Sequence, residues 1–92
     1  MKKQWHIEFS DHALRSLKKL DKTTASLIIG YIEKNLVNCD NPRSLGKPLV
    51  SNHKGKWRYR VGDYRLLCFI EDQKVLIVVI EIGHRSDIYT IR

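Results

Sequence analysis

The sequence is poor in cysteine and in long apolar runs. Its two cysteines, Cys39 and Cys68, are far apart and have no paired spacing, which favours a reduced cytoplasmic protein over a disulfide scaffold. The longest apolar run, Val75 to Ile80, is far too short to span a bilayer, and no apolar stretch of signal-peptide length follows the N-terminus. No repeat, low-complexity tract or linker is present. We therefore expect a cytoplasmic protein without a membrane segment.

Acidic residues are also scarce. There are 10 Asp and Glu against 17 Lys and Arg, which gives a formal net charge of +7 and a pI near 9.7. Such a balance favours a polyanionic partner, first nucleic acid and then an acidic protein or an anionic membrane surface, although it can also simply aid solubility. With 92 residues, the chain (1–92) is expected to form a single domain with a small core.

The first half of the sequence has the periodicity of one strand and two helices. Apolar residues alternate over residues 5–9, which predicts a half-buried strand. Ser10 and Asp11 supply an N-cap signal for the first helix and Asp21 one for the second, and each helix has one apolar stripe at helical spacing. The stripes consist of Ala13, Leu14, Leu17 and Leu20 in the first helix, and of Ala25, Ile28, Ile29, Ile32 and Leu36 in the second.

The second half predicts an antiparallel meander. Strands are expected at residues 56–61, 64–70 and 75–82, with Gly83 ending the last, while residues 44–53 are either a loop or a short edge strand. A helical turn is expected at 86–89. The fold class is thus α+β: an N-terminal strand, a helical hairpin, then a three- to four-stranded antiparallel meander with the helices on one face. The other face would be free to bind.

A stripe of positive charge lies on the first meander strand. Because side chains alternate along a strand, Lys54, Lys56, Arg58 and Arg60 fall on one face, while Trp57 and Tyr59 point into the core. If Gly62 and Asp63 form a two-residue turn and supply its unusual backbone angles, Arg60 lies directly opposite Arg65. Like charges in that position destabilise a hairpin by up to roughly 1 kcal/mol. A fold keeps such a pair more readily when an anion lies between them.

Two motifs, residues 57–65 and 83–89, closely resemble those of the RelE/ParE superfamily of bacterial and archaeal toxins. The resemblance implies the RelE-like fold and the toxin of a type II toxin–antitoxin pair. For the RelE branch it implies a ribosome-dependent endoribonuclease, an mRNA interferase that cuts mRNA in the decoding site and inhibits translation. Its partners would be mRNA on the ribosome, with 16S rRNA contacts, and a cognate antitoxin. Carried over by motif position, the working residues are Arg58, Arg60, Arg65, Arg85 and Tyr89.

Cleavage of RNA without a metal requires a base for the 2′-hydroxyl, charge stabilisation at the phosphorane, and an acid for the leaving 5′-oxygen. Arginines at 60, 65 and 85 suit the second task, because guanidinium groups grip phosphate oxygens and keep their charge. The best-known relatives have lysines at positions 58 and 60, and arginine is a weaker base candidate than lysine. His84 is the only histidine in the two motifs, so it is the candidate acid or base, or else a phosphate or antitoxin contact.

The remaining candidates have simpler roles. Lys54, Lys56 and Arg58 are expected to bind RNA electrostatically. Tyr89 either stacks on a base or sugar, or packs to anchor the C-terminal turn. The other histidines are scattered without a cysteine or carboxylate at ligand spacing, so neither a metal nor another cofactor is expected.

Two other functions remain open. ParE-like relatives of this fold poison DNA gyrase and have no nuclease activity, although they generally lack the full basic and tyrosine set. Alternatively, the arginines at positions 58 and 60 leave a catalytically weakened protein that only binds its antitoxin or RNA.

Overall fold

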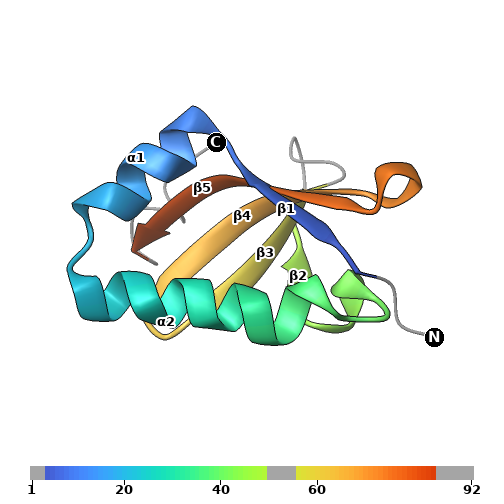
Figure 1. Cartoon of the computed structure of the whole chain (residues 1–92), viewed down its shortest axis with the longest axis horizontal. Coiled ribbons are helices and arrows are strands. Elements are labelled where there is room, and N and C mark those ends of the chain that lie inside the picture. Colours follow the sequence, from blue (N-terminus) through green and yellow to red (C-terminus); the bar gives the residue numbers. More distant parts are fainter. Residues whose placement is uncertain (1–3, 50–55, 85–92) are drawn as a thin grey trace.

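The computed structural model describes residues 4–49 and 56–84, which form a mixed sheet and two helices (Figure 1). In chain order the elements are β1 (His6–Phe9), α1 (Asp11–Lys19), α2 (Lys22–Ile32), β2 (Lys47–Pro48), β3 (Lys56–Val61), β4 (Tyr64–Glu71) and β5 (Leu76–His84). A π-helical segment, Glu33–Val37, continues α2, and 3₁₀ turns form at Pro42–Ser44 and Asp72–Lys74.

The strands lie in the order β1-β5-β4-β3-β2, so the first and last strands of the chain are neighbours (Figure 1). Strands β2 to β5 pair antiparallel in sequence order, which confirms the predicted meander in its four-stranded form. Strand β1 instead pairs parallel with β5, with His6 opposite Leu76 and Phe9 opposite Val79. The predicted α+β class is confirmed, and the sheet is five-stranded because β1 joins it.

Both helices are capped at predicted positions: of the two candidates for α1, Ser10 is the cap and Asp11 is in the first turn, and Asp21 caps α2. The Ser10 hydroxyl accepts the N–H of Ala13 at 3.0 Å and donates to the carbonyl of Ile80 on β5 at 2.6 Å, so it caps α1 and ties it to the sheet. The Asp21 carboxylate accepts the hydroxyl of Thr24 at 2.6 Å and its N–H at 3.2 Å. These two bonds stabilise the ionised form and lower the pKa of Asp21.

The core lies between the helices and one face of the sheet. Along β4, Leu66, Cys68 and Ile70 alternate toward this core, whereas Arg65, Leu67 and Phe69 occupy the opposite face. The buried cluster joins both helices to three strands and consists of Trp5, Ala13, Ile28, Ile32, Leu36, Tyr59, Leu66, Cys68, Ile70, Ile77, Val79 and Ile82. Helices α1 and α2 therefore pack on the same face of the sheet.

Several local predictions are wrong. Leu14 is 40% exposed rather than buried, because it lies past the edge of the stripe that Ala13 and Leu17 form. Strand β5 does not stop at Gly83 but runs through His84, since the first residues of β4 pair with both. In the β3–β4 turn only Gly62 has a positive φ, +60°, as in a type II′ turn. Asp63 therefore does not supply the unusual backbone angle that the sequence predicts for it.

Candidate functional site

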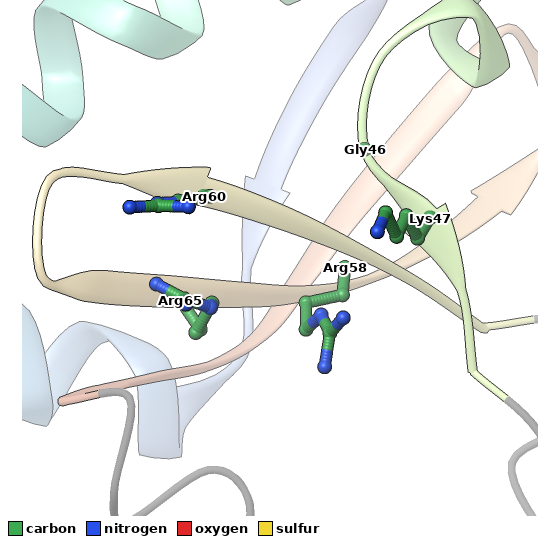
Figure 2. Close-up of a pocket in the computed structure, with 5 residues that line it drawn as sticks. All are labelled: Gly46, Lys47, Arg58, Arg60 and Arg65. Atoms are coloured by element: carbon green, nitrogen blue, oxygen red, sulfur yellow. The ribbon is translucent and has the colours of Figure 1, made fainter.

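Four cations line a pocket on the face of the sheet opposite the core cluster (Figure 2). The pocket has a volume of about 220 Å³, and its described lining residues are Gly46, Lys47, Arg58, Arg60 and Arg65. No carboxylate is among them, so the pocket is strongly electropositive. We call this group of residues the cationic pocket.

The strand register builds the pocket. Arg60 on β3 lies directly opposite Arg65 on β4, as the hairpin turn predicted. Arg58 lies opposite Lys47 on β2, which brings a third strand into the pocket. Figure 2 shows the Lys47 side chain reaching from β2 toward the β3–β4 hairpin.

The two opposed arginines differ in their surroundings. Arg65 is only 5% exposed, although it is charged, and one of its guanidinium nitrogens donates to the carbonyl of Tyr64 at 3.3 Å. Arg60 is exposed at the rim. A buried, planar guanidinium presents fixed donors to an anion, while the exposed one can close over it. The pair is thus suited to grip a phosphate from two sides.

The segment that carries Lys47 is held from the core side of β3. The Trp57 indole donates to the carbonyl of Leu45 at 2.6 Å, and the Tyr59 hydroxyl donates to the carbonyl of Pro42 at 2.5 Å. Burial strongly raises the pKa of Tyr59. The predicted inward orientation of both aromatics is confirmed, with Tyr59 buried and Trp57 partly so.

Gly46 brings β2 close to β3. Its φ is +72°, and a Cβ there would lie 2.9 Å from Trp57 Nε1 and 2.9 Å from Tyr59 Cδ1. A residue with a side chain would therefore be both strained and crowded at this position. The sequence pattern at residues 44–53 allows either a loop or a short edge strand, and within the part that the structure describes an edge strand forms at Lys47–Pro48.

The structure places His84 on a different face from the two opposed arginines. His84 pairs with Tyr64 at the end of β5, and the two rings meet edge to face with centroids 5.6 Å apart. Tyr64 packs against the core cluster, whereas Arg65, one residue along, faces the pocket and pairs with Gly83. His84 is exposed and does not line the cationic pocket.

The other predicted site residues divide into two groups. Lys56 lies on the pocket side of β3, but further along, opposite Phe69. Lys54, Arg85 and Tyr89 lie outside the described residues. The structure therefore brings together Arg58, Arg60 and Arg65 and adds Lys47, which the sequence did not single out.

Two features bear on other kinds of chemistry. Burial raises the pKa of the Cys68 thiol, which lies in the core cluster and not in the pocket. Over residues 4–49 and 56–84, no three histidine, cysteine, aspartate or glutamate side chains gather as metal ligands would. None of the helices in those ranges is long and apolar enough to cross a membrane.

Comparison with known proteins identifies the class. The family model of the ParE toxin of the type II toxin–antitoxin system parDE matches residues 7–89. The toxin RelG of Mycobacterium tuberculosis is 32% identical over 83 residues, which covers 90% of this chain and 93% of RelG. The toxin RelE of the same organism is 33% identical over 85 residues, covering 92% of this chain and 86% of RelE.

Solved structures agree with the observed fold. The toxin–antitoxin complex RelBE2 of Mycobacterium tuberculosis contains a chain that matches with a TM-score of 0.81 and 29% identity, over 95% of this chain and 100% of that one. A mutant of the Escherichia coli toxin RelE in the free state matches with a TM-score of 0.73, covering 96% of this chain and 93% of that one. Its identity is 22%, so it supports the fold alone.

The fold and these matches define the chain as a toxin of the type II toxin–antitoxin class. Within that class it belongs to the ParE toxin family, and its relatives include toxins named RelE and RelG.

Proposed function

We propose that this protein is a metal-independent mRNA endoribonuclease that cleaves mRNA on the ribosome. The observation that carries the proposal is the cationic pocket, in which Arg60 and Arg65 oppose each other across one hairpin. Its volume of about 220 Å³ is large enough for a phosphate group. The partners would be mRNA with 16S rRNA contacts and a cognate antitoxin, in the cytoplasm.

The proposed reaction is attack of the ribose 2′-oxygen on the adjacent phosphorus, which breaks the bond to the 5′-oxygen of the next nucleotide. The products are a 2′,3′-cyclic phosphate and a free 5′-hydroxyl, so one proton leaves the 2′-oxygen and one reaches the 5′-oxygen. Arg60 and Arg65 would stabilise the charge that builds up on the phosphorane, with Arg58 and Lys47 holding a neighbouring phosphate. We assign Arg85 and Tyr89 to the catalytic site, as their motif positions imply, with Arg85 adding to the charge stabilisation. Lys54 and Lys56 would bind the RNA electrostatically.

Proton transfer needs a group other than the arginines. We keep His84 as the candidate for proton transfer. Its neighbour Gly83 pairs with Arg65, so RNA held by Arg65 could reach His84 around the end of β5. A His84→Gln variant should bind ribosomes normally and cleave slowly in single-turnover assays. Unchanged cleavage would remove His84 from the mechanism.

The main test is induced expression followed by primer extension on a translated mRNA. Arg60→Ala and Arg65→Ala should each reduce cleavage by about 10²- to 10³-fold, the usual loss for one preorganised donor. The matched control is Arg15→Ala on the outer surface of α1, which should cleave like the wild type.

The match to the ParE family model favours a second candidate, inhibition of DNA gyrase without cleavage. A supercoiling assay with purified gyrase separates the two. Gyrase-linked DNA breaks with intact mRNA would refute the nuclease proposal. Antitoxin or RNA binding without either activity would identify a catalytically weakened protein.

A further inference from the structure

An apolar stripe runs beside the cationic pocket on the same face of the sheet. By register, Leu67 and Phe69 of β4 lie on this face, with Leu67 opposite Glu81 and Phe69 opposite Val78 of β5. Leu67 is only 5% exposed, and Leu67, Phe69 and Val78 neither belong to the core cluster nor pack against it. Phe69 is 37% exposed even though β4 lies in the middle of the sheet. Phe69 and the partly exposed Val78 lie side by side on the face that carries the cationic pocket, so together they form a candidate contact surface.

Charge is distributed unevenly around Phe69. On its β3 side the directly opposite residue is Lys56, and Arg58 is its diagonal neighbour, within reach of a long side chain. On its β5 side lies Val78, beyond which β1 contributes Glu8. Phosphates would therefore be attracted to β3 and repelled from β1. Flat apolar groups would fit over the strands between them, β4 and β5.

Single-stranded RNA combines these two chemistries. Proteins that bind unpaired strands use a positive groove for the backbone and aromatic side chains on which bases stack. Arg65 and Phe69 are four residues apart on one strand, or about 13 Å at roughly 3.3 Å per residue. At a stacked spacing of about 3.4 Å per nucleotide, no more than about four nucleotides separate them.

We propose that Phe69 is a base-stacking platform for single-stranded RNA, which holds a nucleobase within about four nucleotides of the phosphate gripped by Arg60 and Arg65. The inference rests on the proposed function for its choice of RNA. The backbone of the bound strand follows β3, and its bases lie over β4 and β5. Phe69 thus positions the RNA and takes no part in proton transfer.

The test measures affinity of the purified protein for a short fluorescent single-stranded RNA. Phe69→Ala should weaken binding about 5- to 150-fold, the range for loss of one stacked base. Phe69→Trp should retain affinity, and Phe69→Leu should lose most of it. The control is Leu27→Ala, an exposed leucine of α2 that is 61% exposed and should not matter.

A set of RNAs with one abasic position each identifies the stacked base. With the RNA that lacks the stacked base, the affinity of the wild type should fall by the same factor by which Phe69→Ala weakens binding. The affinity of the Phe69→Ala variant should not fall further with that RNA. The slope of log K against log salt should stay unchanged in Phe69→Ala, because no ionic contact is removed. A loss at every position alike, or a changed slope, would show a general structural effect and overturn the inference.

Two outcomes separate this inference from the proposed function. If translated mRNA is cleaved but Phe69→Ala binds RNA like the wild type, the inference fails and the function stands. If the Phe69 effect is present but mRNA is not cleaved, the function fails and the inference stands. If Phe69→Ala weakens binding of an acidic antitoxin peptide and leaves RNA affinity unchanged, the surface binds protein and the inference is wrong.

Discussion

Gly46 shows how a residue without a side chain can shape a binding pocket. It lines the cationic pocket and lets β2 approach β3 so closely that its own missing side chain would meet Trp57 and Tyr59. The same two aromatics donate hydrogen bonds to the carbonyls of residues 45 and 42, so these bonds hold the segment before β2 close to β3. The position of Lys47 in the pocket therefore depends on Gly46.

Replacing Gly46 with alanine should destabilise the protein by about 1–3 kcal/mol, since alanine would be held at φ +72° and would crowd β3. Urea unfolding measures this loss, and RNA affinity should fall with it as Lys47 moves. Gly30→Ala is a matched control, because a Cβ at Gly30 in α2 meets nothing within 4 Å. That variant should gain about 0.5–1 kcal/mol from helix propensity. Equal effects at the two glycines would contradict this account.

The residues of the pocket were predictable to the extent that their contacts are local. The pairing of Arg60 with Arg65 follows from a two-residue turn, so the sequence was sufficient to place them together. Lys47 joins them because β2 pairs with β3. The connection between residues 48 and 56 is too long for the sequence to predict the register of that pairing. His84 is close to the arginines in the sequence motif, yet strand alternation turns it to the other face.

At the scale of elements, Ser10 joins the first helix to the last strand. Its hydroxyl caps α1 at Ala13 and donates to the carbonyl of Ile80. Ser10→Ala should therefore cost about 2 kcal/mol, at the upper end for an N-cap, because a second hydrogen bond is lost as well. Thermal or urea unfolding measures the loss, and Ser26→Ala on the exposed side of α2 should change stability by less than about 0.5 kcal/mol. A Ser10→Ala cost no larger than this control would show that the link to β5 contributes nothing.

Periodicity predicted the elements better than their partners. The strands from residue 56 onward lie within two residues of their predicted bounds, and both helix caps lie at predicted positions. The parallel pairing of β1 with β5 could not be predicted, because alternation shows that a strand has two faces but not which edge it joins. Val75 also escaped prediction: its φ is +50°, which a β-branched residue rarely adopts, and it belongs to the turn before β5 and not to the strand.

For the whole molecule, the net charge of +7 is less informative than its distribution. Cations lie on the outer surface of α1, where Lys18 and Lys19 are exposed, as well as in the cationic pocket. Charges in both places attract a polyanion at long range. Only those that contact phosphate release a counterion on binding, so the salt dependence of affinity distinguishes them.

We therefore expect Lys47→Gln and Lys19→Gln to differ, although each removes one positive charge. Lys47→Gln should reduce the slope of log K against log salt by about 0.7, the value for one phosphate contact on a single strand. Lys19→Gln should leave the slope unchanged, because Lys19 lies on α1 while the pocket is built from β2, β3 and β4. The measurement is a salt titration of binding to short single-stranded RNA. Equal slope changes in the two variants would mean that RNA is attracted by overall charge, and that the cationic pocket is not its binding site.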